Sequence, residues 1–330
     1  MPTSRSPLRI LFSCVGRRVE LVQAFARAGK ALKLPLEIWG ADVSKSAPAM
    51  SFCNRSHVVP PIDDAGYIPA LAELVRRRGI RLLIPLIDSD LLPLAESKRL
   101  FSEVGCTVLV STPATVSTCR DKLVTYQHLS AAGIDTPRTW TLEEVLAATR
   151  RHFPYFVKPR RGSAGAGLHV IDSDADLAQV RRWVDDPILQ EYIRGPEFTL
   201  DAYTGFNGNP TCVVPRKRLR TRGGEVSESQ VQIEPDLLEL GRRVVASLPG
   251  CMGVVTIQCM RRNGGRPAVI EINPRFGGGV PLSIEAGADM PKWILQELTG
   301  RKPRIPPTAR RDGLLMTRYD QSVFGAAAKR

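Results

Sequence analysis

Short apolar runs alternate with amphipathic segments over the first 110 residues. Four of these runs predict buried strands, namely Leu8–Cys14, Leu36–Gly40, Leu82–Leu86 and Thr107–Val110. Segments 17–30 and 65–78 between them carry apolar residues at helical spacing. This alternation predicts a parallel sheet covered by helices on both faces. Ligands bind at the carboxyl ends of strands in such sheets, so Ser13–Arg18, Asp42 and Asp88–Asp90 are candidate ligand contacts.

The pattern changes after Pro113 to helices mixed with antiparallel strands. Expected helices cover 121–132, 141–150, 174–184, 235–247 and 282–299. Expected strands cover 155–159, 168–171, 188–192, 197–203, 210–215, 253–260 and 267–272, the last two joined by Asn263–Gly264–Gly265. Asn273–Gly279 is expected to form an exposed turn, and residues 301–330 a basic, weakly structured tail. The whole chain is therefore of the α/β class.

Composition narrows the class of protein further. A length of 330 residues suggests about two domains, and no apolar stretch reaches the roughly 18 residues that cross a bilayer. The start of the chain has no signal-peptide pattern. Seven cysteines, an odd number with no C-x-x-C pair, argue against a disulfide framework, and the four histidines lack metal-ligand spacing. We therefore expect a cytoplasmic protein without zinc chemistry.

The net charge of +13 suggests either a nucleic-acid partner or a site for anionic small molecules. Its distribution favours the second reading. Residues 301–330 carry eight basic and two acidic residues, and residues 216–222 carry five basic ones, so two short segments hold most of the excess. No aromatic residue interleaves with the basic run at 216–222, as a base-stacking platform would require. A non-catalytic nucleic-acid-binding protein remains the alternative.

A lysine and a glycine-rich hairpin predict an anion site. Lys158 ends an expected strand, and Gly162, Ser163, Gly165 and Gly167 follow it. Free amides and a lysine that face one space suit a phosphate chain. The alternative is a flexible surface hairpin with a solvated lysine. The lysine precedes the glycines, so this is not the G-x-x-x-x-G-K-[ST] loop, and no helix follows Gly167, so it is not the dinucleotide fingerprint.

Two further groups of polar residues follow. The Glu191 carbonyl and the Ile193 amide could pair with an adenine edge, and Glu197 could accept ribose hydroxyls, unless this is an ordinary strand and turn. Glu271 and Asn273 share one face of a strand, and its hairpin partner can bring Gln258 alongside. Such oxygen ligands suit Mg²⁺, and Arg275 could clamp a phosphoryl group. The alternative is a strand end whose carboxylate pairs with an arginine.

The order of these pieces resembles the ATP-grasp superfamily. The resemblance starts at Asp121–Lys122, covers roughly residues 110–300, and is most specific over Asn273–Gly279 through Glu285–Gly287. It is closest to the halves of the carbamoyl-phosphate synthase large subunit and to stand-alone carboxylate–amine ligases. It implies a Rossmann-like N-terminal domain over 1–112, followed by a two-lobed ATP-grasp domain. The small lobe would cover 113–187, the large lobe 188–300, and the tail 301–330.

The resemblance also implies roles for individual residues. Lys122 and Lys158 would contact the phosphates and adenine, and Gly162–Gly167 would be the lid. The adenine hinge would be Gln190, Glu191, Tyr192 and Ile193, with Glu197 at the ribose. The metal ligands would be Gln258, Glu271 and Asn273. Arg275 would steady the transferred phosphoryl group, which makes it and Lys158 the expected catalytic residues. Many relatives carry an acid where Gln258 stands, so one negative charge fewer is available for one or two metal ions.

The implied cofactors are ATP and Mg²⁺, with Mn²⁺ able to replace the latter. The implied reaction activates a carboxylate as an acyl phosphate and joins it to an amine, without a nucleophilic side chain. The alternatives are phosphorylation of bicarbonate or carbamate, and nucleotide binding without ligation. For the substrates, both small molecules, we expect contacts from Lys217, Arg218, Arg275, Gly277 and Gly278, although 216–222 could equally be a solvated loop. A homodimer is common for such folds.

Overall fold

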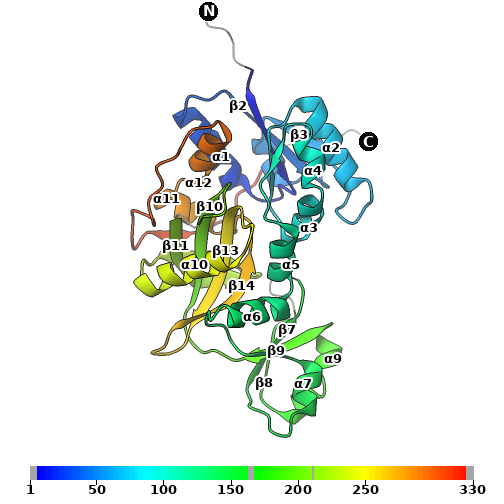
Figure 1. Ribbon diagram of the computed structural model, residues 1–330, viewed down its shortest axis with the longest axis vertical. Helices are drawn as coiled ribbons and strands as arrows, with labels where there is room; N and C mark the ends of the chain where they lie inside the picture. The colour runs from blue at the N-terminus through cyan, green and yellow to red at the C-terminus, as the bar shows by residue number, and fades with distance from the viewer. Residues whose placement is uncertain (1–5, 163–166, 210–211, 325–330) are drawn as a thin grey trace, which may run out of the picture.

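The computed structural model describes residues 6–162, 167–209 and 212–324, which form three sheets. The small sheet lies at the opposite end of the molecule from the N-terminal sheet, and the largest sheet lies between them (Figure 1). Within the described ranges the longest helices have 13 residues, and none has both the length and the apolarity that crossing a bilayer requires.

The N-terminal sheet is parallel throughout, as the alternating pattern predicts. Its strand order is β3-β2-β1-β4-β5. The strands are β1 (Leu8–Ser13), β2 (Leu36–Asp42), β3 (Arg55–Val58), β4 (Leu82–Pro85) and β5 (Thr107–Val108). Successive residues of β1 are buried on opposite faces. Phe12 packs with α1 (Val19–Ala31) and Leu11 with α2 (Tyr67–Arg78) and α3 (Asp88–Glu96). The short helix α4 (Lys98–Ser102) follows.

Two elements of this domain were missed by the sequence prediction. They are strand β3 and the short 3-10 helix Pro48–Phe52. Every residue of β3 is exposed, so the strand has no apolar alternation for the sequence to reveal. It forms because backbone groups pair with β2 at the sheet edge, an arrangement that side-chain patterns do not encode.

The small sheet is antiparallel, with order β6-β9-β7-β8. Its strands are β6 (Thr139–Thr141), β7 (Tyr155–Pro159), β8 (His169–Ile171) and β9 (Pro187–Glu191), and its helices are α7 (Leu142–Ala147), α8 (Asp174–Leu177) and α9 (Val180–Trp183). The core between them holds Tyr155, Val157 and Leu189. Strands β7 and β8 form the predicted hairpin around the glycine-rich segment, of which residues 163–166 lie outside the described ranges.

The large sheet has order β14-β13-β10-β11-β12-β15 and is antiparallel. Its strands are β10 (Glu197–Gly205), β11 (Cys212–Arg222), β12 (Glu225–Val231), β13 (Gly253–Arg261), β14 (Pro267–Asn273) and β15 (Leu315–Thr317). Helix α10 (Pro235–Ser247) packs on one face through Val213 and Leu200. The other face, with Tyr203 and Val214, packs against α11 (Val280–Glu285), α12 (Met290–Leu298) and the first domain.

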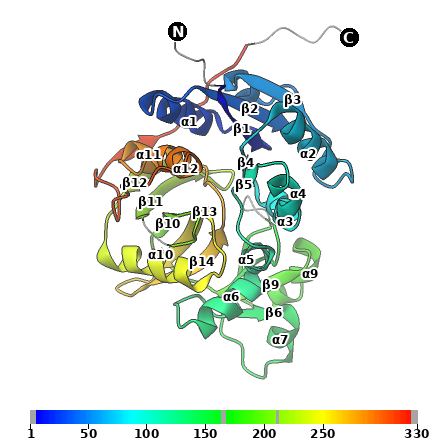
Figure 2. The ribbon, with the colours of Figure 1, turned by 45° about the horizontal axis from the view of Figure 1, so that its top comes forward.

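Two consecutive helices connect the N-terminal domain to the lobes. They are α5 (Pro113–Arg120), which the sequence did not predict, and α6 (Lys122–Ala131) (Figure 2). Asp121 lies between them and accepts hydrogen bonds from the amides of Leu123 and Val124, at 3.1 and 3.2 Å. It also pairs with Arg160 at 2.9 Å. The start of α6, and with it Lys122, is thereby fixed next to the end of β7.

Two expectations from the sequence are wrong. Residues 216–222 are not a loop but the second half of β11, which turns at Gly223–Gly224 into β12. The described part of the tail is not weakly structured, because β15 pairs with β12. The Val213 amide also donates to the Pro307 carbonyl at 3.1 Å, and the Arg310 amide to the Ala286 carbonyl at 2.8 Å. Sheet edges offer unpaired backbone groups. Apolar residues of the tail also pack against the core, namely Ile305, Ala309, Leu314 and Met316.

Gly195 lies in the segment between β9 and β10, and this segment lines a cavity. Its φ of 154° is one that residues with side chains rarely adopt, and a Cβ there would lie 1.8 Å from the Arg261 carbonyl oxygen. The Arg261 amide donates a 3.0 Å hydrogen bond to the Pro196 carbonyl. This bond keeps the backbone of Gly195 close to that of Arg261. Only glycine permits the β9–β10 connection to lie this close to β13.

We expect Gly195→Ala to destabilise the protein more than Gly105→Ala. Both positions have positive φ, but nothing lies within 4 Å of a Cβ at Gly105. The collision with Arg261 is present only at Gly195, and overpacking of this kind costs about 1–3 kcal/mol. Urea unfolding of the two variants measures it. Equal losses would show that the segment relaxes freely around an added methyl group.

Candidate functional site

A cavity of about 1120 Å³ lies where the three sheets meet. Most of the residues singled out from the sequence line it: Lys122, Lys158, Gly162, Gln190, Glu191, Tyr192, Ile193, Glu197, Arg218, Gln258, Glu271, Asn273, Arg275, Gly277 and Gly278. Gly167 and Lys217 do not line it. Ser163 and Gly165 lie outside the described residues. Segments more than 150 residues apart in sequence thus contribute to a single space.

Lys158 is a buried cation in the wall of this cavity. Its side chain extends from β7 and is 5% exposed, and its Nζ donates to the Ile270 carbonyl at 3.2 Å. Burial, together with the charge of Lys122, lowers the pKa of Lys158 to about 8, against the influence of Glu271. Lys122 Nζ donates to the Gly162 carbonyl at 2.9 Å. The two ammonium groups therefore line one cavity, and an anion between them would relieve their repulsion.

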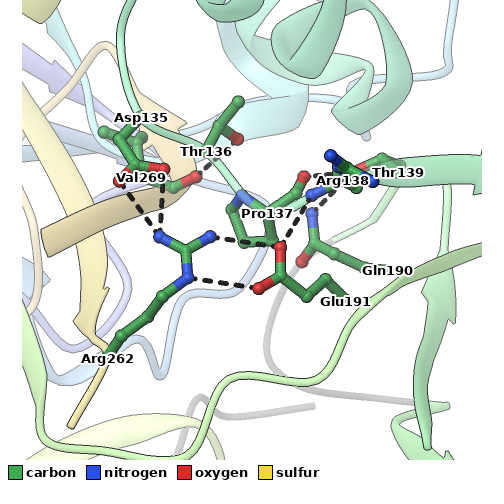
Figure 3. A network of polar contacts seen from close by, with 9 residues as sticks. All are labelled: Asp135, Thr136, Pro137, Arg138, Thr139, Gln190, Glu191, Arg262 and Val269. Carbon is green, nitrogen blue, oxygen red and sulfur yellow. Dashed lines mark hydrogen bonds and ion pairs between the residues drawn. The ribbon is translucent and has the colours of Figure 1, made fainter. Parts of the chain in front are cut away.

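The expected hinge is held by an ion-pair network (Figure 3). The Glu191 carboxylate accepts two hydrogen bonds from Arg262, each 3.1 Å long, and one from the Arg138 amide at 3.3 Å. Arg262 also donates to both oxygens of Asp135 at 3.0 Å. Burial by itself raises the pKa of Glu191, but these hydrogen bonds outweigh it and lower the pKa. The side chain of Glu191 is thus engaged away from the cavity.

Arg262, which follows β13, lies outside the motifs recognised in the sequence. Its role depends on a contact between the β13–β14 hairpin and β9, two parts of the chain that are separated by about 70 residues. Gln190, the other polar residue of the hinge, is buried and donates to the Thr139 hydroxyl at 2.9 Å. Both side chains hold the segment in place, as does the Glu191 amide, which donates to the Arg138 carbonyl at 2.8 Å.

Gln258 and Glu271 lie directly opposite each other in the pairing of β13 with β14, and Thr256 lies opposite Asn273. The strand register thus brings together the three oxygen-bearing side chains expected at a metal site. Among the described residues there is no cluster of three or more histidine, cysteine, aspartate or glutamate side chains. One carboxylate and two amides suit a hard cation that draws further oxygen ligands from a phosphate and water. These three side chains therefore fit Mg²⁺ when phosphate and water complete its coordination.

The basic run on β11 divides between the two faces of the sheet. Arg218 lines the cavity and pairs with Glu197 at 3.0 Å, whereas Lys217 lies on the face of Val213, toward α10. Lys217, an expected substrate contact, thus lies outside the lining of the cavity. Arg216 is 1% exposed and pairs with the fully buried Asp201 at 2.7 Å. One of the five charges is thus internal, which weakens the case for a nucleic-acid patch.

Arg275 reaches from the turn after β14 to the N-terminal domain. Its Nη2 lies 2.7 Å from Asp88 Oδ2, at the start of α3, and its Nη1 donates to the Phe276 carbonyl at 3.2 Å. The turn Asn273–Gly279 is largely buried, contrary to the expectation of an exposed turn, because the first domain covers it. Arg18 and Asp88, from two loops at the carboxyl end of the parallel sheet, complete the cavity.

These two loops are positioned by a buried carboxylate. Asp90 accepts hydrogen bonds from the Ser13 hydroxyl at 2.5 Å and from the Tyr67 hydroxyl at 2.7 Å. Burial raises the pKa of Asp90 to about 6, against the effect of the hydrogen bonds. Asp90 thus links the end of β1 to the start of α3, between which the cavity opens.

Comparison with protein families finds a match for each of two segments of the chain. Residues 119–279 match a family model described as an ATP-grasp domain, and residues 10–109 match one described as a PylC-like N-terminal domain. The ATP-grasp resemblance inferred from the motif order is therefore confirmed.

Two curated proteins match part of the chain. A formate-dependent phosphoribosylglycinamide formyltransferase of Stutzerimonas stutzeri is 32% identical over 182 residues, which are 53% of this chain and 43% of the relative. A D-alanine–D-alanine ligase of Petrotoga mobilis is 23% identical over 203 residues, 57% of this chain and 67% of the relative. The aligned region thus spans less than half the length of the first of these proteins.

Solved structures share the fold. N5-carboxyaminoimidazole synthetase from Staphylococcus aureus, complexed with ADP, superimposes with a TM-score of 0.71 over 91% of this chain and 79% of that one, at 17% identity. The L-amino acid ligase from Bacillus licheniformis gives 0.68 over 89% and 75%, at 18% identity. A biotin carboxylase domain dimer from Hydrogenobacter thermophilus, solved with MgADP and bicarbonate, gives 0.71 over 92% and 72%, at 18% identity.

We expect Arg262→Met to destabilise the protein by about 1–2 kcal/mol, because hydrogen bonds to charged groups are stabilising but solvent screens these partly exposed ones. The pKa of Glu191 is lowered in the folded state, so its contribution is present above the pKa of the unfolded chain and is lost as the pH falls through the folded value. Urea unfolding at pH 7 and below pH 4 measures both effects. Arg266→Met, an exposed residue of the same hairpin, is the control. Equal effects of the two substitutions would show that the network contributes nothing measurable.

Proposed function

We propose that this chain, in which an ATP-grasp domain follows a PylC-like N-terminal domain, is an ATP- and Mg²⁺-dependent ligase. It would activate a substrate carboxylate as an acyl phosphate and join it to an amine. One observation carries the proposal: a single cavity gathers buried Lys158, the Gln190–Ile193 segment and the Gln258–Glu271–Asn273 set. Together these supply a phosphate contact, a base-pairing edge and metal ligands, as the family relationship leads one to expect.

The nucleotide would lie between the two lobes. Glu191 and Ile193 line the cavity while the Glu191 carboxylate is occupied by Arg262, which supports a backbone contact with adenine. Lys158 and Lys122 would hold the phosphates. Burial raises the pKa of Glu197, and Arg218 opposes this effect. A Glu197 carboxylate that is already polarised by Arg218 suits a contact with ribose hydroxyls.

Magnesium would be held by Glu271 with the amide oxygens of Gln258 and Asn273, and by the nucleotide itself. When bound, the ion would neutralise negative charge on the phosphates. A single protein carboxylate makes the affinity of the site depend on the bound nucleotide, because most of the remaining ligand charge comes from phosphate.

The reaction would need positioning and charge neutralisation rather than a nucleophilic side chain. A carboxylate oxygen of the acid attacks the γ-phosphorus of ATP, and the bond to the β–γ bridging oxygen breaks to release ADP. The amine then attacks the acyl carbon, inorganic phosphate leaves, and the amine loses a proton. Arg275, with its unpartnered, buried Nε among the described residues, would face the developing charge on the transferred group.

A homodimer is part of the proposal, in keeping with the fold relative solved as a dimer. Sedimentation analysis of the purified chain decides this separately from activity. The acid and the amine would both be small molecules, because the cavity that holds the proposed nucleotide site also contains the space for them.

The central test is titration calorimetry of ATP with and without Mg²⁺. We expect binding that depends on Mg²⁺, and a loss of about 1–3 kcal/mol, roughly 5- to 150-fold in affinity, in Lys158→Ala through loss of charge-assisted hydrogen bonds. Glu271→Gln should weaken the dependence on Mg²⁺ while retaining the fold, as checked by circular dichroism. If the wild-type chain binds no nucleotide at any Mg²⁺ concentration, the proposed function is wrong.

The lowered pKa of Lys158 predicts proton uptake on binding. Below pH 7 the amine is charged in both the free and the bound protein. At pH 8.5 a group with a pKa of about 8 is mostly neutral, so ADP binding should take up about 0.7 proton and affinity should fall as pH rises further. Calorimetry of ADP with saturating Mg²⁺, in buffers of different ionisation enthalpy, measures the uptake, with Lys158→Met as the control. Equal uptake by the two proteins would assign the proton to another group.

A further inference from the structure

The N-terminal domain places one guanidinium group in the cavity, that of Arg18, for which the described part of the chain shows no hydrogen bond. Arg18 precedes α1, and its side chain is 20% exposed. Its one ion pair among the described residues is with Glu225, at 3.8 Å, too long for a hydrogen bond. Burial lowers the pKa of Arg18, and the nearby charge of Arg275 lowers it further, against the influence of Glu225. A cation in such surroundings is under-compensated.

The carboxylate nearest to Arg18 is shared with another arginine. Glu225 lies at the start of β12, and its Oε2 accepts a hydrogen bond of 3.1 Å from Arg318, which also donates to the Val226 carbonyl. Arg318 follows β15, so the edge strand of the tail brings it there. Arg275 is paired with Asp88. The guanidinium groups of Arg18, Arg275 and Arg318 thus share two carboxylates, those of Glu225 and Asp88.

The glycine turn after Arg275 leaves room for Arg18. A Cβ on Gly278 would lie 2.7 Å from Arg18 Nη1. Any side chain there would displace the guanidinium or fill the space in front of it. The backbone of Gly277–Gly279 lines the same part of the cavity. The arginine of one domain is thus seated against a bare backbone turn of the other, next to Arg275.

Building on the proposed function, we propose that Arg18 recognises a second carboxylate of the acid substrate. The carboxylate to be activated would lie at Arg275, near the metal ligands, while a second one would pair with Arg18 beside Gly278. A guanidinium group without a hydrogen-bonded carboxylate of its own among the described residues suits a carboxylate of the substrate. The substrate class is therefore a dicarboxylic acid, an acidic amino acid included, and the PylC-like domain selects it.

The test uses the full chain with the nucleotide site filled by MgAMPPNP. Malonate, succinate, glutarate, aspartate, glutamate and citrate are compared with acetate, propionate and glycine at constant ionic strength, by calorimetry and thermal unfolding. We expect the wild-type chain to bind at least one of the acids with two or more carboxylates tenfold more tightly than any of the other three. Arg18→Gln should lose that tenfold preference and keep its affinity for AMPPNP within about twofold.

The neighbouring Arg17 provides a matched control, since it is exposed and does not line the cavity. Arg17→Gln removes the same charge and should retain the preference. Equal binding of the acids by wild type and Arg18→Gln would overturn the proposal, as would a wild-type chain that never prefers a second carboxylate. A chain that fails to bind AMPPNP would instead refute the proposed function, so the two failures are distinguishable.

Discussion

A buried ion pair at the centre of the large lobe sets the geometry of the whole cavity. Asp201 on β10 has no exposed surface and pairs with Arg216 on β11, and the Ser283 hydroxyl of α11 donates to it at 2.6 Å. Thr256 lies beside this pair and donates to the Arg275 carbonyl at 3.0 Å. Separating the two charges at such depth would cost about 3–5 kcal/mol. The sheet, α11 and the turn that carries Arg275 therefore keep one arrangement.

Around that fixed turn, burial affects the lysine and arginine side chains of the cavity differently. A buried ammonium group can lose its proton, and the pKa of Lys158 falls to about 8, whereas guanidinium groups stay charged under the same burial. In the proposed reaction the lysines face phosphates whose charge changes little on binding. The arginines lie where new charge develops or where a carboxylate is recognised. Charge that must persist in a partly dry site is thus carried by arginine.

The order of motifs predicted most of the cavity from sequence, and strand periodicity explains why. Glu271 and Asn273 are two residues apart, so they share a face in any strand, and the β13–β14 hairpin left few registers for Gln258. The same parity places Arg216 and Arg218 on one face and Lys217 on the other. The interpretation of 216–222 as a loop hid this difference, because side chains in a loop do not alternate between two faces.

The sequence by itself determined the parallel N-terminal sheet, the two antiparallel lobes and the residues that converge on one cavity, because each follows from local periodicity and motif order. Only the tertiary structure decided what those residues contact. The Glu191–Arg262 network, the seat of Arg18 against Gly278 and the pairing of β15 with β12 each join segments far apart in the chain. Such contacts depend on how packed sheets approach one another. No local pattern of residues records that approach.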